Sequence, residues 1–341
     1  MKKIAIVNSE NRDLFCKYWM AYCEKNGIQY KTVDPYKSDI IRETDDCEAM
    51  MWNFTHFDHR DMLCARSILY SLETKGVKCF PSYRTCWHFD DKIAQKYLLE
   101  AVGAPLVRSY VFYDREEAKA WARETTYPKV FKLRGGAGSM NVKLAHNRRE
   151  AERLIEQSFG EGFRQYRWRE QFTEAWNKYK IGKTTLRETL RPLKLALKRY
   201  PTPFDHYRQR EMGYAYFQDF IPGNKYDIRV VVIGERAFAF KRMVRPGDFR
   251  ASGSGSIVYD KSGIDERCVR MAFEVNEKLK SQCITFDFVF DEENKPFIVE
   301  ISYAFVSWLY LDCEGYWTRD MAWHEGTNFD FCGWMVEQVL Q

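Results

Sequence analysis

The stretch Ile284–Tyr303 carries acidic side chains whose spacing fits a metal site. Two runs rich in Phe, Ile and Val flank a polar turn, a pattern typical of a two-stranded hairpin. If the hairpin is centred between residues 293 and 294, Asp287 pairs with Glu300, and Ser302 falls on the same face. Hard oxygen ligands of this kind suit Mg²⁺ held together with substrate phosphates. The alternative is an ordinary amphipathic hairpin whose acidic face lies in water.

A glycine-rich loop follows a second predicted strand that carries a lysine. The strand spans Val130–Leu133 and includes Lys132, and a returning strand is predicted at 141–144. Backbone N–H groups of such a loop can approach an anion closely, and the lysine adds a point charge for phosphate. No GKS or GKT sequence ends it, so it is not a Walker loop, and a flexible hairpin turn is the alternative. The candidate phosphate-binding loop residues are Gly135, Gly136, Gly138, Ser139 and Met140.

Arginines recur on and after the two strands predicted at 226–233 and 237–243. Asp227 and Arg229 share one face of the first strand, and three further arginines follow close together in the sequence. Beside an acidic hairpin, arginines supply the paired hydrogen bonds and positive charge that phosphoryl transfer needs. Surface ion pairing is the alternative for any one of them. The candidate set is Arg229, Arg242, Arg245 and Arg250.

Two other polar stretches have less specific patterns. Thr55–Asp61 contains two histidines and two aspartates, but the spacing is not diagnostic of zinc. A solvated loop or helix cap explains it better, and we assign it no function.

Between residues 160 and 200, eleven Lys or Arg stand against four Glu, with aromatic residues interleaved. This basic segment suits an acidic partner such as nucleic acid, a sugar nucleotide or an anionic membrane surface, or it is a helical insertion with a solvated basic face.

Composition indicates a folded protein of a reducing compartment. The 341 residues suffice for two or three domains, and 45% hydrophobic residues supply apolar cores. A net charge of +5 does not by itself imply a nucleic-acid partner. No uncharged apolar run reaches membrane-spanning length, and the first residues lack the apolar core of a signal peptide. The ten cysteines include no CxxC pair, which favours reduced thiols in the cytoplasm.

The order of predicted elements indicates how these residues are positioned. Strands alternate with helical stretches over the first 90 residues, which favours a parallel sheet. No GxGxxG follows the first strand, so a dinucleotide site has little support. Asp90-Asp91-Lys92 then opens a helix that runs through Glu100. We expect an α/β domain at 1–89, a small lobe with the glycine loop and basic insertion at 90–213, and a large lobe with the acidic hairpin at 214–341.

These features occur in the order that resembles the ATP-grasp ligases, in particular their RimK-like and glutathione-synthetase-like branch, over residues 90–303. The resemblance implies an ATP-grasp fold, α/β overall and α+β in the catalytic part, after a preceding parallel-sheet domain. It implies that ATP and Mg²⁺ bind, with Mn²⁺ as an alternative ion. By the same resemblance the nucleotide phosphates contact Lys92, Lys132 and the glycine loop. The backbone of Gln218-Asp219-Phe220-Ile221 reads the adenine, and Asp227 lies near the ribose.

The resemblance also assigns the reacting end of the site. The arginine set would steady the γ-phosphate or an acyl phosphate, and Asp287 and Glu300 match the metal carboxylates. The third metal ligand of the family is usually Asn, whereas this chain has Ser302, a weaker neutral ligand. The aromatic segment 303–326 departs from the family pattern. With Asp320, His324 and Glu325 it either shapes an acceptor pocket or forms a lid on the core.

The implied activity is an ATP-dependent ligation of a carboxylate to an amine or thiol through an acyl phosphate. The acceptor is a sugar, an amino acid or a peptide, and cell-envelope or polysaccharide precursors are the setting that we favour. No nucleic-acid partner is expected, and a homodimer is one arrangement to test. Two alternatives remain: a small-molecule kinase on the same scaffold, and a regulatory module that binds ATP without turnover.

Overall fold

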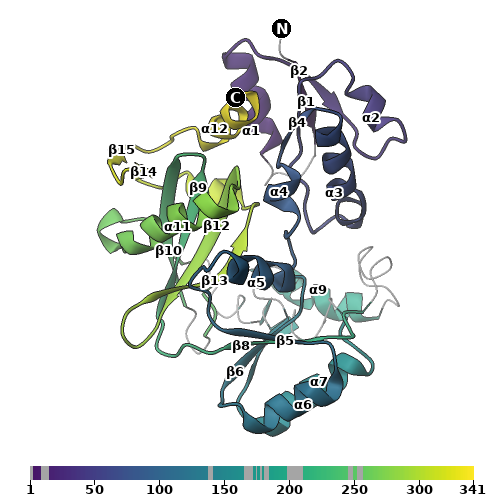
Figure 1. Ribbon diagram of the computed structural model, residues 1–341, viewed down its shortest axis with the longest axis vertical. Helices are drawn as coiled ribbons and strands as arrows, with labels where there is room; N and C mark the ends of the chain where they lie inside the picture. Colours follow the sequence, from purple (N-terminus) through teal and green to yellow (C-terminus); the bar gives the residue numbers. More distant parts are fainter. Residues whose placement is uncertain are drawn as a thin grey trace.

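The computed structural model contains three β-sheets, which we call the N-terminal sheet, the small-lobe sheet and the large sheet. Figure 1 shows the N-terminal sheet at the upper right, the small-lobe sheet at the bottom and the large sheet on the left. The structure describes residues 3–8, 15–136, 141–164, 172–173, 175–176, 179, 184–197, 210–244, 249–251 and 256–341. Among the described residues, no helix is both long and apolar enough to cross a membrane.

The N-terminal sheet is parallel, as the alternating pattern predicts, with strand order β2-β1-β3-β4. Apolar side chains of β1 are buried on both faces because helices cover both sides. Asp58 caps the start of α3 by accepting a hydrogen bond from the Arg60 amide. The elements are β1 (Lys3–Val7), α1 (Cys16–Lys25), β2 (Gln29–Val33), α2 (Ile40–Glu43), β3 (Ala49–Met51), α3 (His59–Thr74), β4 (Lys78–Phe80) and α4 (Tyr83–Cys86).

The small-lobe sheet is antiparallel, with strand order β5-β8-β6-β7. Its helices α6 and α7 lie side by side beneath it in Figure 1 and close a core around Phe131 and Phe217. Helix α5 enters this lobe from the N-terminal side. The elements are α5 (Lys92–Ala101), β5 (Ser109–Phe112), α6 (Arg115–Glu124), β6 (Lys129–Lys132), β7 (Val142–Ala145), α7 (Arg148–Phe159), α9 (Leu186–Ala196) and β8 (Ala215–Asp219).

The large sheet is antiparallel, with strand order β13-β12-β9-β10-β14-β15, and β11 pairs with β10. Helix α11 covers one face, where Val230 and Phe286 pack with Val269 and Ala272. The elements are β9 (Tyr226–Ile233), β10 (Arg236–Met243), β11 (Ile257–Val258), η1 (Lys261–Gly263), α11 (Glu266–Leu279), β12 (Cys283–Phe290), β13 (Pro296–Ser302), η2 (Ser307–Tyr310), β14 (Gly315–Thr318), β15 (Trp323–Glu325) and α12 (Phe331–Leu340).

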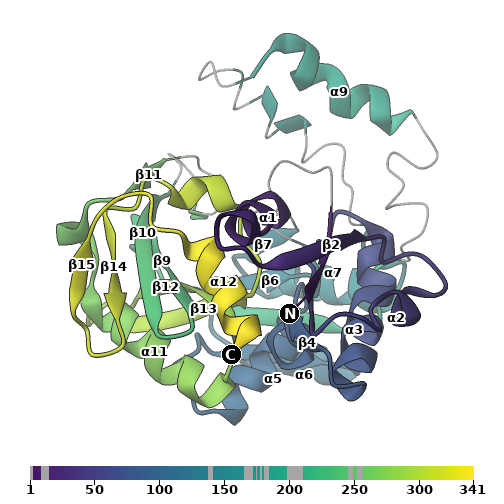
Figure 2. The same cartoon turned by 90° about the horizontal axis from the view of Figure 1, so that it is seen from above.

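The two ends of the chain pack together. Helix α12 lies beside α1, as both Figure 1 and Figure 2 show, and the Tyr22 hydroxyl donates to Glu337 at 3.2 Å. A Cβ at Gly333 would lie 2.4 Å from the Tyr22 ring, so only glycine lets the helices approach this closely. Both helices share one apolar cluster with the large sheet, which includes Trp19, Phe238 and Met335. This cluster joins the N-terminal sheet to the large sheet.

The ten cysteines all lie in the described part of the chain, and no disulfide bond joins any of them. Nine are buried, and burial raises the pKa of thiols such as Cys23, to about 11, and Cys86, to about 12. These side chains therefore behave as small apolar residues of the core. The prediction of scattered reduced thiols in the cytoplasm stays a prediction.

Candidate functional site

The acidic hairpin contains the predicted pair of Asp287 and Glu300, but the strands are brought into this register by a bulge that the sequence does not mark. Asp287 on β12 lies opposite Glu300 on β13. Next to the turn, however, Phe290 pairs with Pro296, and the register shifts by one residue between Asp287 and Phe288. This bulge restores the pairing that a turn centred between 293 and 294 would give. The two carboxylates thus share one face of the large sheet.

Asp287 lies in a group of four charges that we call the ionic cluster: Asp227, Arg242 and Asp287, which are buried, and Arg229, which is half-buried. Arg229 donates two hydrogen bonds to Asp287, at 2.6 and 2.7 Å. Arg242 donates two to Asp227, at 2.7 and 2.6 Å, and also lies 2.8 Å from Asp287. Burial acts to raise the pKa of Asp287, but the two arginines outweigh it and hold that pKa well below its usual range. The formal charges of the cluster cancel, which is what makes its burial tolerable.

The Asp227 carboxylate faces Arg242 within this cluster, and its expected place near the ribose stays a prediction. The register explains the position, because Asp227 pairs directly with Arg242 across β9 and β10, and Arg229 pairs with Asp287 across β9 and β12. Cross-strand partners point to the same face of a sheet. The ionic cluster is therefore built by three adjacent strands of the large sheet.

Two buried lysines approach the acidic hairpin from the small lobe. Lys92, the first residue of α5, donates to the Gly136 carbonyl at 2.7 Å and lies 3.0 Å from Glu300. Lys132, the last residue of β6, donates to the Gln218 side chain at 2.6 Å. Burial lowers the pKa of Lys132 to about 8; Lys92 acts in the same direction, whereas Glu300 opposes the shift. Burial also acts to lower the pKa of Lys92, but Glu300 and neighbouring aspartates outweigh it and raise that pKa.

The start of α5 is tied to the start of the glycine loop. Asp91 caps the helix by accepting from the amides of Ile93 and Ala94. The Gly136 amide donates to Asp90 at 2.7 Å, and Gly136 has φ of 120°, a conformation that favours glycine. Gly135 and Gly136 thus lie beside Lys92. The loop residues Gly138, Ser139 and Met140 lie outside the described residues.

The predicted adenine-reading segment, Gln218–Ile221, runs from the end of β8 towards the large sheet. Gln218 is buried, and its side chain joins Lys132 to the Ser109 hydroxyl, which accepts at 3.0 Å. Asp219 pairs with Lys129 at 2.5 Å. Phe220 meets Phe249 edge to face, with ring centroids 5.7 Å apart. The role of the backbone here stays a prediction, and the contact between the Gln218 side chain and Lys132 has no marker in the sequence.

The remaining predicted residues are placed as follows. The Ser302 hydroxyl donates to the Ala304 carbonyl at 2.9 Å and accepts from the Ala304 amide at 3.2 Å. This hydroxyl is therefore engaged in a local turn at the end of β13. Arg250 is half-buried, and Arg245 lies outside the described residues. Asp320, His324 and Glu325 belong to or adjoin β14 and β15, at the opposite edge of the large sheet from β13.

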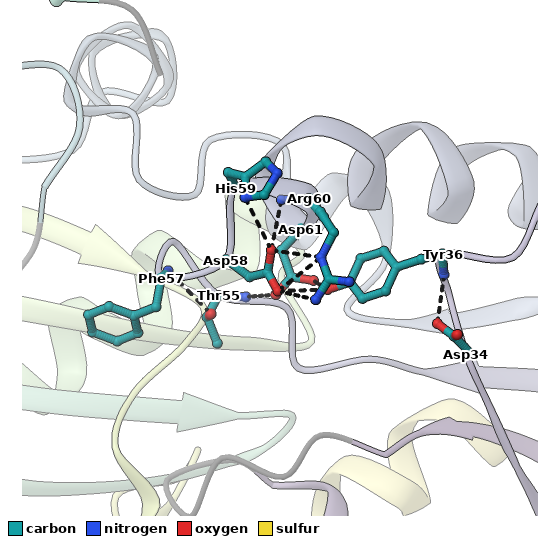
Figure 3. A network of polar contacts seen from close by, with 8 residues as sticks. All are labelled: Asp34, Tyr36, Thr55, Phe57, Asp58, His59, Arg60 and Asp61. Atoms are coloured by element: carbon teal, nitrogen blue, oxygen red, sulfur yellow. Dashed lines mark hydrogen bonds and ion pairs between the residues drawn. The ribbon is translucent and has the colours of Figure 1, made fainter. Parts of the chain in front are cut away.

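The polar stretch Thr55–Asp61 forms a hydrogen-bonded network at the start of α3 (Figure 3). Arg60 pairs with Asp58 at 2.7 Å and stacks on the Tyr36 ring, 3.9 Å from its centroid. Asp61 accepts from the Tyr36 hydroxyl and from the Thr55 amide, each at 2.7 Å. Within the described ranges, no three His, Cys, Asp or Glu side chains are grouped so as to hold a metal ion. The helix-cap interpretation accounts for this stretch.

The basic segment is described only in part. Its helix α9 begins with Thr185 as cap, in a reciprocal arrangement with Glu188. Arg187, Arg191 and Lys194 on this helix are exposed. Figure 2 shows α9 standing away from the three sheets. Arg167, Arg169, Lys178, Lys180, Lys183, Lys198 and Arg199 lie outside the described residues.

One part of the chain matches a known protein family. Residues 210–305 match the family model of the RimK-like ATP-grasp domain. This range contains the ionic cluster and the acidic hairpin. A search of curated proteins found no significant match.

Known structures resemble the chain over nearly its whole length. The biotin carboxylase domain of Hydrogenobacter thermophilus 2-oxoglutarate carboxylase, solved with MgADP, ADP and bicarbonate, is 15% identical with a TM-score of 0.60; the match covers 99% of this chain and 69% of that one. A RimK-domain ATP-grasp protein from Sphaerobacter thermophilus is 15% identical with a TM-score of 0.58, covering 99% and 100%. The ATP-grasp ligase PsnB, solved with its precursor peptide and AMPPNP, is 12% identical with a TM-score of 0.54, covering 100% and 99%.

Proposed function

Because the chain has the ATP-grasp fold and carries a RimK-like domain over residues 210–305, we propose that it is an ATP- and Mg²⁺-dependent ligase that joins a carboxylate to an amine. The observation that carries this proposal is the 3.0 Å ion pair between Lys92 and Glu300. It brings Lys92, the lysine proposed to contact phosphate, against Glu300, the carboxylate proposed to bind the metal. Binding ATP phosphates and a divalent ion at one place requires this juxtaposition.

In this proposal the nucleotide lies between the small-lobe sheet and the large sheet. Lys92 and Lys132 contact its phosphates, and the loop over 135–140 covers them. The backbone of Gln218–Ile221 contacts the adenine. Phosphates replace Glu300 as the partner of Lys92, which keeps the buried ammonium paired.

The residues present fit a magnesium ion, since Asp287 and Glu300 are opposed carboxylates on neighbouring strands. Mg²⁺ bound there would neutralise the phosphate charge that develops during transfer. Ser302 is the weakest of the proposed ligands because its hydroxyl already bonds Ala304 in both directions. When Asp287 binds a cation, Arg229 and Arg242 lose one hydrogen-bond acceptor. Both arginines can then donate to phosphoryl oxygens of the substrate in place of Asp287.

The reaction then needs positioning and charge neutralisation, with no protein nucleophile. An oxygen of the substrate carboxylate attacks the γ-phosphorus, and the bond to the β,γ-bridging oxygen breaks to release ADP. The amine nitrogen attacks the carbonyl carbon of the acyl phosphate, and phosphate leaves with the electron pair of the C–O bond and takes up the proton that the nitrogen loses. Arg229, Arg242 and Arg250, with Arg245, balance the negative charge on the phosphoryl group throughout.

The substrates are proposed at the level of chemical class. PsnB is complexed with a peptide in its structure, and the exposed basic residues of α9 suit an anionic substrate. We therefore include amino acids, peptides and sugar-linked precursors of polysaccharides among the acceptors to test. The chain is proposed to act in the cytoplasm, where its ten thiols stay reduced. A homodimer also remains a prediction.

Incubation with MgATP and pooled amino acids, with and without hydroxylamine, tests the activity. ADP release with hydroxamate formation is the expected result, since hydroxylamine captures an acyl phosphate. A stable phosphorylated product without hydroxamate would identify a kinase, and nucleotide binding without ADP release under any mixture would identify a regulatory module. Asp287→Asn should abolish turnover. The matched control is Glu293→Gln, an exposed carboxylate in the turn of the same hairpin, which should leave turnover unchanged.

A further inference from the structure

One face of the large sheet changes from charged to apolar along its strands. On β9 and β10 the paired residues Asp227–Arg242 give way to Arg229–Phe240 and then to Val231–Phe238. Successive pairs two residues apart lie on the same face. The ionic cluster thus lies next to buried phenylalanine rings on the same face of the sheet. A side chain at the boundary between them can contact the charged groups and the rings.

The short helix η2 places Tyr310 at this boundary. The Tyr310 ring centroid lies 4.8 Å from that of Phe240, 5.5 Å from that of Phe238 and 4.5 Å from that of Phe305. The helix is held in place by a 2.7 Å hydrogen bond from the Tyr259 hydroxyl to the Leu309 carbonyl. The ring is therefore fixed by packing, and its hydroxyl has a defined position.

That hydroxyl lies at the charged end of the face. Burial raises the pKa of Tyr310 to about 12, while Arg229 and Arg242 act in the opposite direction and Asp287 raises it further. The side chain is only 1% exposed. Its oxygen faces Arg229 as a hydrogen-bond donor, but its own proton has no acceptor within reach among the described residues. An arginine only donates hydrogen bonds, so Arg229 cannot accept one from the Tyr310 hydroxyl. Asp287 or a bound anion could accept from both groups.

A second hydroxyl on the same helix has the same property. Ser307 is fully buried, and its hydroxyl also lacks a hydrogen-bond partner within the described ranges. In a 3₁₀-helix, side chains three residues apart lie on the same side, so Ser307 and Tyr310 point the same way from η2. Native proteins leave few buried polar groups unsatisfied, and each of these has a cost to the ligand-free fold. Two such groups on one side of one helix indicate a site that a ligand completes.

We propose that the Tyr310 and Ser307 hydroxyls, together with Arg229, form an oxyanion subsite that receives the substrate carboxylate or the phosphoryl group in transfer. This inference rests on the proposed ligase function and adds residues that the sequence motifs do not mark. The subsite opens when Arg229 leaves Asp287 and turns to the incoming anion. The hydroxyls then donate to anionic oxygens, and their unsatisfied state in the free protein is relieved on binding.

Tyr310→Phe tests the subsite because it removes the hydroxyl and keeps the ring. In the ligand-free variant, the thermal unfolding midpoint should be unchanged or raised, since an unsatisfied group is removed. MgADP affinity should stay within about twofold of wild type. Titration of the MgADP complex with inorganic phosphate, and separately with acetate, should show an affinity lower by about tenfold to a hundredfold for the anion that binds there, the usual loss for a hydrogen bond to a charged group. The two titrations distinguish the phosphoryl group from the carboxylate.

The matched control is Tyr127→Phe, which removes a hydroxyl that donates to the Ala122 carbonyl at 2.7 Å in the small lobe. It should lower the unfolding midpoint and leave both anion affinities unchanged. Ser307→Ala provides a second variant, with a smaller loss of anion affinity and no loss of stability. Wild-type affinity of Tyr310→Phe for both anions would overturn the inference, as would absence of anion binding to wild-type protein that binds MgADP. Failure of wild-type protein to bind MgADP at all would instead refute the proposed function.

Discussion

Lys132, at the end of β6, should make the affinity for ADP depend on pH, in a pH range where ADP itself does not titrate. Burial lowers the pKa of Lys132 to about 8 in the free protein. A phosphate in contact with the ammonium favours its charged form and returns the pKa towards its ordinary value. Binding therefore takes up a proton above pH 8, and affinity must fall as the pH rises. The second pKa of a phosphate, about 6, lies well below this range.

The magnitude follows from the fraction of charged lysine. At pH 7 about nine-tenths of Lys132 is protonated, and at pH 9 about one-tenth, so the affinity for ADP should be about tenfold lower at pH 9, or about 1.4 kcal/mol. Calorimetric titrations with ADP in EDTA exclude any contribution from a metal. Repeating them at pH 8.5 in buffers of different ionisation enthalpy should show uptake of a fraction of a proton.

Two variants isolate the responsible group. Lys132→Met should bind ADP more weakly at pH 7 and show little change between pH 7 and 9. The control is Lys96→Met. Lys96 lies one turn after Lys92 on α5 and pairs with Glu100, so this variant should keep the wild-type dependence of ADP affinity on pH. An equal affinity at both pH values in wild-type protein, or an unchanged slope in Lys132→Met, would refute the assignment of Lys132 to the phosphates.

Three further changes probe the hairpin and the packing of the termini. Asp287→Asn should abolish the Mg²⁺-dependent gain in ADP affinity and lower the free energy of unfolding by about 3–5 kcal/mol in urea titrations, because the buried Arg242 and the half-buried Arg229 lose a charged partner. Ser302→Ala removes the hydrogen bonds with Ala304; it should cost about 1 kcal/mol and leave the Mg²⁺ affinity unchanged, and weaker Mg²⁺ binding would show that the hydroxyl is a ligand. Gly333→Ala should destabilise the fold by about 1–3 kcal/mol through overpacking, and a Tyr22→Ala background should remove most of that loss.

The sequence was sufficient for features set by local patterns. The parallel arrangement of the first four strands and the antiparallel hairpins follow from periodicity and turn composition. It was insufficient where the position of a side chain depends on a distant strand. The bulge beside Asp287 has no marker in the sequence, yet a hairpin without it would offset the two carboxylates by one residue.

Long-range partners account for the other differences. Charged residues at alternate positions show which side chains share a face, but they do not show that Asp227 takes Arg242 as its partner. The role of Gln218 depends on a contact with Lys132, 86 residues earlier in the chain. Tyr310 resembles any aromatic core residue in the sequence, and what distinguishes its hydroxyl is the absence of an acceptor among the residues that the structure describes.

The pairing of α12 with α1 has a consequence for synthesis of the protein. The hydrogen bond between Tyr22 and Glu337 joins residues 315 positions apart. At ribosomal rates of about 5–20 residues per second, the first helix waits about 15–60 s for its partner. Throughout that interval the apolar side chains around Trp19 lack part of the surface that covers them in the finished protein. The nascent N-terminal sheet is thus a natural client for chaperones, and mutations in α12 should reduce the yield of folded protein by prolonging this exposure.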